Sequence, residues 1–485
     1  MPTQTSAPEA VRRPTPAPTT GMSGRDRLIL LILCAAQFIV ALDFSILNVA
    51  LPVLGRDLGT GQADLQWAVT AFALPSGGFL LLSGRIADLY GRRRLFLTGL
   101  GLFAVASVLA TVAWSPAVFL AGRALQGVGA AVIVPTGMAL LTTTFAEGPQ
   151  RERALGISGT LLSLGFTVGM VLGGVLTDSL GWRSTMGLLA VAGAGILALA
   201  PTLLTESRRP DRPRIDVPGA VTVTGGLLAL IYALSTAATN GFAHADVLIT
   251  LVAGFALLAA FVLVEARSPE PLVSLPMLRR PAVAFGNLAG LTTVSMMSTV
   301  VFLLTLYLQE VLHLSPFRTG LIFGVQGVVS ALAGIVAPRL IARFGARRTL
   351  LTGLLVQATL TASLLGLGTE APSAWLAMAG VTFASLGHLW VIVSYGVTAT
   401  SGLRNEEQGL ATGLVTSAQQ IGMTVGIPLL SALASARINA LRAEGVDFAT
   451  ATLNGVRLAL AADTVILLTV ATLVTFGLRR HTRTV

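Results

Sequence analysis

Two ionisable side chains of this chain lie deep inside apolar stretches, where charged residues are rare. Asp43 lies about fifteen residues into the apolar run 28–52, and Arg123 lies about seven residues into the run 117–144. An ionised carboxylate in an apolar surrounding is costly, so Asp43 must be protonated part of the time, paired, or in contact with water. Reversible proton binding is therefore the chemistry that Asp43 could perform. The alternative is a structural carboxylate that caps a local helix break near Pro52.

The positions of Asp43 and Arg123 favour a pair. If the first run begins inside a membrane and the fourth begins outside, both residues lie about seven or eight residues from the outer surface. We expect them to share a water-filled cavity, in which Arg123 stabilises the charged form of Asp43 or relays its proton. The alternative is that Arg123 pairs only with backbone carbonyls or with Gln126 and ties its helix to the neighbouring helices.

The elements that position these groups are a series of apolar runs. Mean hydropathy is +0.80, 54% of the residues are hydrophobic and 11% are charged. Each run is roughly long enough for the about 20-residue helix that crosses a bilayer, and a backbone in lipid satisfies its hydrogen bonds within a helix. We therefore predict an all-α polytopic membrane protein. The fourteen predicted spans are 28–52, 66–84, 95–113, 117–144, 155–176, 184–204, 218–238, 246–264, 285–308, 319–338, 349–367, 374–399, 409–434 and 458–478.

The arginines predict the orientation of these helices. All 32 basic residues are Arg; with the N-terminus inside, 25 fall in cytoplasmic segments, six in external loops and only Arg123 within a span. Short segments rich in Arg stay in the cytoplasm, so we expect a bacterial inner-membrane protein with both termini cytoplasmic. Residues 1–24, rich in Pro and Thr, are expected to form a disordered tail rather than a signal peptide.

An internal repeat predicts two similar halves. A predicted loop, 84–94, follows the second run and another, 338–348, follows the tenth, and both place a small turn residue before an Arg cluster. Gly165-x-x-x-Gly169 and Gly422-x-x-x-Gly426 are likewise eight runs apart. Duplicated bundles around a central site are typical of secondary transporters. We predict an N-terminal six-helix bundle (25–205), a cytoplasmic linker with accessory helices 7 and 8 (206–270), a C-terminal six-helix bundle (271–480) and a cytoplasmic tail (481–485).

Several functional classes lack support in the sequence. The single cysteine, Cys34, and four scattered histidines exclude an internal disulfide and give no metal-ligand spacing. There is no Walker motif for an ATP-driven pump, no catalytic constellation for a membrane enzyme and no soluble output domain for a sensor. We therefore expect no metal, no cofactor, no enzymatic activity and no nucleic-acid partner.

Four motifs, taken together, are specific enough to indicate a protein family. They are Leu42-Asp43-x-Ser-Ile-x-Asn48-Val-Ala-Leu-Pro52, Gly84-x-Ile-Ala-Asp88-x-x-Gly91-Arg92-Arg93, Arg123-x-x-Gln126-Gly-x-Gly129, and Gly165-x-x-x-Gly169-x-x-x-Gly173-Gly174, supported by Tyr307-Leu308-Gln309. On these residues the chain, from about Arg25 to Arg480, resembles the major facilitator superfamily and, within it, the 14-span drug:proton antiporter branch. Met170 departs from the family pattern, which has proline after the second glycine of the last motif.

The resemblance implies two six-helix bundles plus two accessory helices and a function. A protein of this branch exports lipophilic, often cationic drugs or antibiotics by alternating access, with protons entering as the substrate leaves. It needs no cofactor, draws energy from the proton gradient and is expected to be a monomer in the lipid bilayer. By resemblance, proton coupling and substrate binding fall to Asp43, Arg123, Gln126 and Asn48. The open alternatives are a proton-coupled exporter or importer of one specific metabolite and, less so, a membrane enzyme.

Two further groups are expected to serve conformational change. Gly84, Asp88, Gly91 and Arg92 form a candidate latch, because an acid before a helix start meets the positive helix dipole and nearby guanidinium groups. A solvated turn would explain the arginines but not Asp88 with its glycines. Small residues at helical spacing let backbones approach closely, so a helix interface, either rocking or simply packed, is expected at Gly165, Gly169, Gly173 and Gly174.

Four polar residues are weaker candidates. Gln419 and Gln420 lie in the thirteenth run and could face a cavity, whereas Glu310 lies at the outer mouth of the ninth. Asp463 lies about six residues into the fourteenth run, where a carboxylate more often serves packing or the interface.

Overall fold

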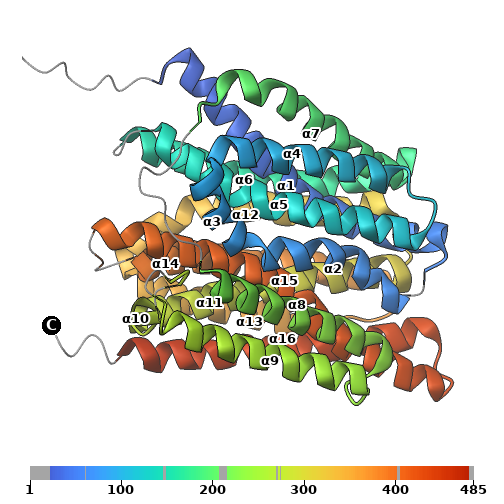
Figure 1. Ribbon diagram of the computed structural model, residues 1–485. Coiled ribbons are helices and arrows are strands. Elements are labelled where there is room, and N and C mark those ends of the chain that lie inside the picture. The colour runs from blue at the N-terminus through green and yellow to red at the C-terminus, as the bar shows by residue number, and fades with distance from the viewer. Residues whose placement is uncertain are drawn as a thin grey trace, which may run out of the picture.

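The described part of the chain is almost entirely helical. The computed structural model describes residues 22–60, 62–145, 149–206, 216–268, 271–273, 275–400, 403 and 405–479. Long helices lie side by side in one bundle, and α1 begins on the same side of the bundle as α16 ends (Figure 1). The all-α membrane fold predicted from the apolar runs is confirmed. The predicted tails, 1–24 and 481–485, fall almost wholly outside the described residues.

The described residues between 24 and 203 form seven helices. They are α1 (Gly24–Leu58), α2 (Gln62–Gly78), α3 (Leu80–Tyr90), α4 (Arg92–Thr111), α5 (Pro116–Thr144), α6 (Pro149–Leu180) and α7 (Arg183–Leu203). Local sequence sets several starts. The Ser23 hydroxyl accepts the Asp26 amide while the Asp26 carboxylate accepts the Ser23 amide, which is a capping box for α1. Ser115 caps α5, and Pro116 occupies its first turn.

The rest of the chain forms an accessory pair and a second set of long helices. These elements are α8 (Val217–Asn240), α9 (Ala245–Glu265), α10 (Leu275–Leu278), α11 (Pro281–Leu306), the π-helical turn η1 (Tyr307–Val311), α12 (Pro316–Phe344), α13 (Ala346–Ser363), the 3-10 turn η2 (Leu364–Gly366), α14 (Ser373–Thr400), α15 (Asn405–Ala443) and α16 (Phe448–Arg479).

The second predicted span, 66–84, is divided between two helices. In the described residues, thirteen helices are each long and apolar enough to cross a membrane. The fourteenth crossing consists of α2 followed by α3, which meet at Phe79. The hydrogen bond from the Phe79 amide to the Pro75 carbonyl keeps the two nearly continuous. Pro75 lacks an amide proton and loosens this part of the helix.

The prediction of basic loops after the second and tenth runs is wrong. Gly84 and Asp88 lie within α3, and residues 338–344 belong to α12. Polar residues at the end of a membrane helix extend it beyond the hydrocarbon, because the helix still satisfies the backbone there. Each connection is instead one glycine, Gly91 with φ 110° and Gly345 with φ 83°. These φ values favour glycine, so the two turns correspond in geometry as well as in sequence.

Helices from the two ends of the chain meet along two faces. In one, α6 packs along α12; in the other, α2 packs along α15, and α8 contacts both of these helices (Figure 1). The Thr224 hydroxyl of α8 donates to the Gly78 carbonyl of α2 at 2.8 Å. The Trp67 and Tyr232 rings also meet at 5.8 Å. The accessory helix α8 therefore packs at the junction between early and late helices, and α9 packs against α8.

Replacing Gly91 with alanine is expected to destabilise the protein more than the same change at Gly345. Both positions have positive φ, but a Cβ at Gly91 would lie 2.6 Å from Glu206 Oε1, whereas a Cβ at Gly345 would meet nothing within 4 Å. Thermal unfolding in detergent measures the difference. Removing the Glu206 side chain in the Gly91→Ala background should recover part of the loss. Equal melting temperatures for Gly91→Ala and Gly345→Ala would contradict the steric explanation.

Candidate functional site

Asp43 and Arg123 form a buried ion pair between α1 and α5. Arg123 Nη1 donates to Asp43 Oδ1 at 2.6 Å, and the two side chains are 1% and 0% exposed. The same nitrogen donates to Gln126 Oε1 at 2.8 Å, one helical turn along α5. Arg123 thus contacts both partners that were weighed from the sequence, the carboxylate and the glutamine.

The pair continues into a network that joins four helices. Arg123 Nε donates to the Ala68 carbonyl of α2 at 3.1 Å, and the guanidinium lies 4.6 Å from the centre of the Phe72 ring. Gln126 Nε2 donates to Ser107 Oγ of α4 at 2.8 Å. The network therefore fixes the relative positions of α1, α2, α4 and α5.

Burial of this ion pair has two opposing effects on the free energy of the folded state. Removing two charges from water costs several kcal/mol per ion, and a close, hydrogen-bonded contact offsets that cost. Asp43 uses only one oxygen for the pair; Oδ2 is buried and has no hydrogen-bond partner among the described residues. A carboxylate held by a cation on one oxygen and unoccupied on the other can bind a proton or a cationic group.

Asn48 does not join this network. It lies five residues further along α1, where its amide nitrogen donates to the Phe44 carbonyl at 2.9 Å. Its Oδ1 is buried and has no partner within the described part of the chain. Asn48 is therefore a separate polar group on α1.

The glycines of α6 let two helices approach closely. A Cβ at Gly165 would lie 2.8 Å from the Phe38 carbonyl oxygen of α1, and side chains at Gly169 and Gly173 would meet α1 as well. A Cβ at Gly174 would instead lie 2.6 Å from the carbonyl oxygen of Pro316 in α12. One stripe of small residues thus serves a contact with α1 and a contact with α12.

The basic cluster at the start of α4 has an acidic partner. The Arg93 amide donates to Glu206 Oε1 at 3.1 Å, and Arg94 Nε lies 3.8 Å from Glu206 Oε2. Arg92 is buried at the first position of α4. The side chain of Asp88 lies outside the described residues. Sequence reasoning missed Glu206, whose only signal was its place at the start of the Arg-rich segment after α7.

Comparison with known proteins decides the family. The model of the Major Facilitator Superfamily matches residues 33–427, most of the chain. The chain belongs to this superfamily. The resemblance inferred from the four motifs is therefore confirmed.

Three similar proteins match most of the chain. The cephamycin export protein CmcT of Amycolatopsis lactamdurans is 38% identical over 411 residues, which are 83% of each chain. The puromycin resistance protein pur8 of Streptomyces alboniger is 36% identical over 433 residues, 88% of this chain and 85% of pur8. The multidrug resistance protein Stp of Mycobacterium tuberculosis is 31% identical, over 86% of this chain and 77% of Stp.

Solved transporter structures have the same fold. The POT family transporter PepTSo aligns with a TM-score of 0.71 over 95% of this chain and 99% of its own, at 14% identity. A bacterial homologue of the human lysosomal transporter Spinster, in an inward-facing and unoccupied conformation, aligns with a TM-score of 0.62 at 16% identity. The predicted major facilitator fold is thus confirmed.

The second half of this superfamily member repeats the glycine contact. A Cβ at Gly422 of α15 would lie 2.6 Å from the Leu291 carbonyl oxygen of α11, and Gly426 faces Ser295 in the same way. Gln419 is half-buried on α15, and the side chain of Gln420 lies outside the described residues. Glu310 is partly exposed in η1. Asp463 is fully buried in α16, far along the chain from the Asp43 network.

Gln309 joins the two halves directly. Its Nε2 donates to the Val49 carbonyl of α1 at 2.9 Å, and the side chain is buried. This residue was not among the predicted site residues, although it belongs to the motif Tyr307-Leu308-Gln309 that supported the family resemblance. Its partner is a backbone carbonyl, which every residue has, so the sequence could not indicate this contact.

Removing one partner of the buried pair is expected to cost more than removing both. Arg123→Gln leaves the Asp43 carboxylate without its cation, so we expect a loss of about 3–5 kcal/mol in the free energy of unfolding. The double variant Asp43→Asn/Arg123→Gln buries no charge and should be more stable than the sum of the single changes predicts. Unfolding of all four proteins in mixed micelles measures this coupling. Additive losses would show that the two side chains do not interact energetically.

Proposed function

We propose that this protein exports lipophilic, often cationic antibiotics or drugs in exchange for protons by alternating access. The buried Asp43–Arg123 pair is the observation that carries the proposal, because it places a titratable carboxylate within a membrane bundle. Duplicated helix bundles around a central site suit alternating access. No cofactor is required, since the proton gradient supplies the energy.

The names of similar proteins support the substrate class. They include a cephamycin export protein, a puromycin resistance protein, a multidrug resistance protein and a tetracenomycin C resistance and export protein. Their stated compounds are small organic molecules of differing chemistry. A hydrophobic bundle that buries the Asp43–Arg123 network suits such molecules better than it suits a highly charged metabolite.

The coupling follows from competition at Asp43. Arg123 stabilises the carboxylate form, and a cationic group near the unpaired Oδ2 would stabilise it further. Binding of the cation therefore favours proton release, and protonation weakens both the ion pair and the cation's binding. This coupling is reciprocal, as linkage requires. Proton entry from outside thus drives release of the substrate there.

The orientation and organisation belong to the same proposal. The Arg clusters after Gly91 and Gly345 mark the cytoplasmic side of the bacterial inner membrane, so both termini are cytoplasmic. Residues 25–205 and 271–480 form the two rocking bundles, with α8 and α9 between them. The turn at Gly91 acts as a latch through Arg93, Arg94 and Glu206. We propose that the monomer is the working unit.

Exchanging Asp43 for asparagine is expected to abolish transport driven by a pH gradient. The change preserves shape but removes titration, so uptake of puromycin into inside-out proteoliposomes should lose its response to an imposed gradient. Exchange of labelled for unlabelled puromycin should continue. Asp57→Asn is the matched control, because Asp57 lies on the same helix but is half-exposed and paired with Arg183. Gradient-driven uptake by Asp43→Asn at the wild-type rate would disprove the assignment.

Reporter fusions test the orientation. Fusions placed after Arg94 and after Arg348 are both expected to report the cytoplasm, because each follows a basic turn of one half. A phosphatase reporter active only outside and a fluorescent reporter active only inside give opposite signals for each site. Different locations for the two fusions would break the proposed repeat.

A further inference from the structure

A second carboxylate is buried in the C-terminal half, and the described part of the chain gives it no partner. Asp463 lies near the middle of α16, fifteen residues after Phe448, and its side chain is 0% exposed. Neither carboxyl oxygen has a hydrogen-bond partner among the described residues. Asp43 by contrast has Arg123, so the two buried acids differ in their surroundings.

The cations on helices around Asp463 lie too far along their axes to reach it. Arg347 of α13 donates to the Thr475 carbonyl. Thr475 lies about 18 Å from Asp463 along the axis of α16, so the Arg347 guanidinium is held at that distance. Arg457 of α16 lies about 9 Å away along the axis and donates to the Leu367 carbonyl. Five elements pack against α16, namely α11, α13, α15, η1 and η2. Their other titratable residues lie near helix ends: Arg348, Arg437, Arg442, Tyr307 and Glu310. Glu406 and Glu407 also belong to α15, but their side chains lie outside the described residues.

An ionised carboxylate is not tolerated in such a place. Its charge would be removed from water with neither a cation nor a donor to stabilise it, at a cost of many kcal/mol. These surroundings favour the protonated form of the Asp463 carboxyl group. Any proton that binds to Asp463 must reach it along a path through the protein.

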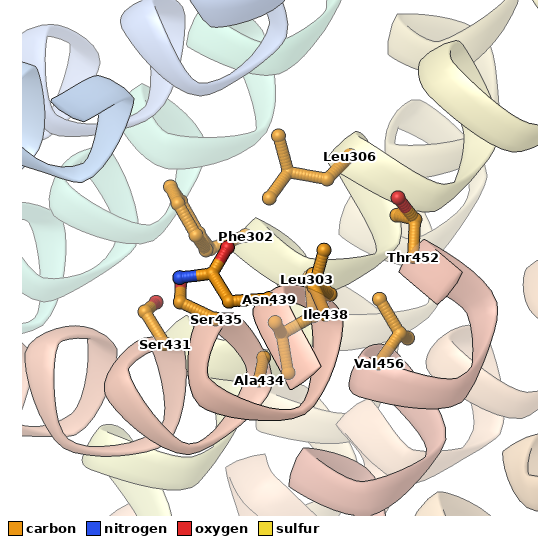
Figure 2. Close-up of a pocket in the computed structure, with 10 residues that line it drawn as sticks. All are labelled: Phe302, Leu303, Leu306, Ser431, Ala434, Ser435, Ile438, Asn439, Thr452 and Val456. Carbon is orange, nitrogen blue, oxygen red and sulfur yellow. The ribbon is translucent and has the colours of Figure 1, made fainter. Parts of the chain in front are cut away.

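A small pocket with a mainly apolar lining and a row of polar side chains opens beside the same helix. It measures about 50 Å³ and lies between α11, α15 and α16, near the connection from α15 to α16 (Figure 2). Ser431, Ser435 and Asn439 line it at intervals of four residues along α15, and Thr452 faces them from α16. The hydroxyls of Ser431 and Thr452 are buried and unpaired in the described structure. A space of this size with free hydroxyls can hold water.

The pocket and Asp463 share one face of α16. Thr452, Val456 and Asp463 are separated by four and seven residues, which is helical spacing. Asp463 lies about 10 Å beyond Val456 along the axis. Ala459 and Leu460 lie between them and are fully buried. The carboxyl group is thus closed off from the pocket by two turns of apolar packing in this conformation.

We propose that Asp463 is a second proton-binding site, filled from the outer side of the membrane through the pocket of Ser431, Ser435, Asn439 and Thr452. Separation of α15 from α16 at Ala459 and Leu460 admits water, and a hydronium ion there transfers its proton to the carboxylate. Closure occludes the protonated acid. The role in transport rests on the proposed proton-driven export, in which coupling to the substrate requires Asp43 and Asp463 adds one further proton per cycle.

Infrared spectroscopy of the purified protein tests whether Asp463 carries a proton. The wild type at neutral pH is expected to show the band of a protonated carboxyl group that Asp463→Asn lacks. Asp447→Asn should retain it. Asp447 directly precedes the same helix and is exposed, and the amide and hydroxyl of Thr450 hold its pKa below the ordinary value, so it stays ionised. An identical band in wild type and Asp463→Asn would overturn the proposal.

Proton counting in proteoliposomes tests the role in transport, with puromycin as the probe. Asp463→Asn is expected to lower the protons exchanged per puromycin by about one while puromycin exchange continues. Thr452→Val keeps the side-chain shape and should slow gradient-driven uptake about tenfold without changing exchange, because it removes a hydroxyl of the entry pocket. Unchanged proton counts in Asp463→Asn would overturn the proposal even if the band is lost, leaving a purely structural acid.

The two proposals fail in different ways. If the wild type moves puromycin without protons, proton-driven export fails, and the infrared band still decides whether Asp463 binds a proton. If the wild type exchanges protons and Asp43→Asn does not, while Asp463→Asn behaves as wild type, only the second site is disproved.

Discussion

The rest of the structure depends on the cost of a charge in an apolar bundle. Asp43 and Arg123 are both almost fully buried, and each is tolerable only while the other remains within hydrogen-bonding distance. This requirement fixes α1 against α5, and the bonds to Ala68 and Gln126 extend it to α2 and α4. Protonation of Asp43 would remove the charge that attracts Arg123. The ion pair that orders the N-terminal half would then weaken, and the helices that it joins could change their packing.

The two halves use similar packing around different chemistry. Gly165 on α6 and Gly422 on α15 bring their helices against the backbone of α1 and α11, and Gly91 and Gly345 make matching one-residue turns. The polar interior differs. In the C-terminal half Gln357 and Thr293 bond to each other, and the Thr293 hydroxyl lies 3.1 Å from His388 Nδ1. Asp463 has no hydrogen-bond partner among the residues that the structure describes. A duplicated scaffold thus holds an ion pair in one half and neutral polar groups in the other.

Contacts between the halves involve small residues and backbone atoms. Gly174 of α6 faces the Pro316 carbonyl, and Gln309 binds the Val49 carbonyl. Backbone partners allow close contact between the halves without depending on a matching side chain. The accessory helix α8 contacts α2 and α15 at the other face. Its bond to the Gly78 carbonyl lies one residue before the break between α2 and α3.

The sequence by itself determined the helical membrane fold, the positions of most spans and the family, because apolar length and the Asp43, Arg123 and glycine motifs are local signals. It also put Asp43 and Arg123 at similar depth, since depth follows from position within a span. Only the tertiary structure decided that they touch, that Glu206 meets the turn at Gly91, and that Gln309 reaches Val49. Those contacts depend on how helices rotate and pack against one another, and several of the partners are backbone atoms, which no residue type in the sequence reveals. The division of the second span at Phe79 and the helical course of Gly84 and Asp88 were likewise settled by packing and backbone hydrogen bonding rather than by hydropathy.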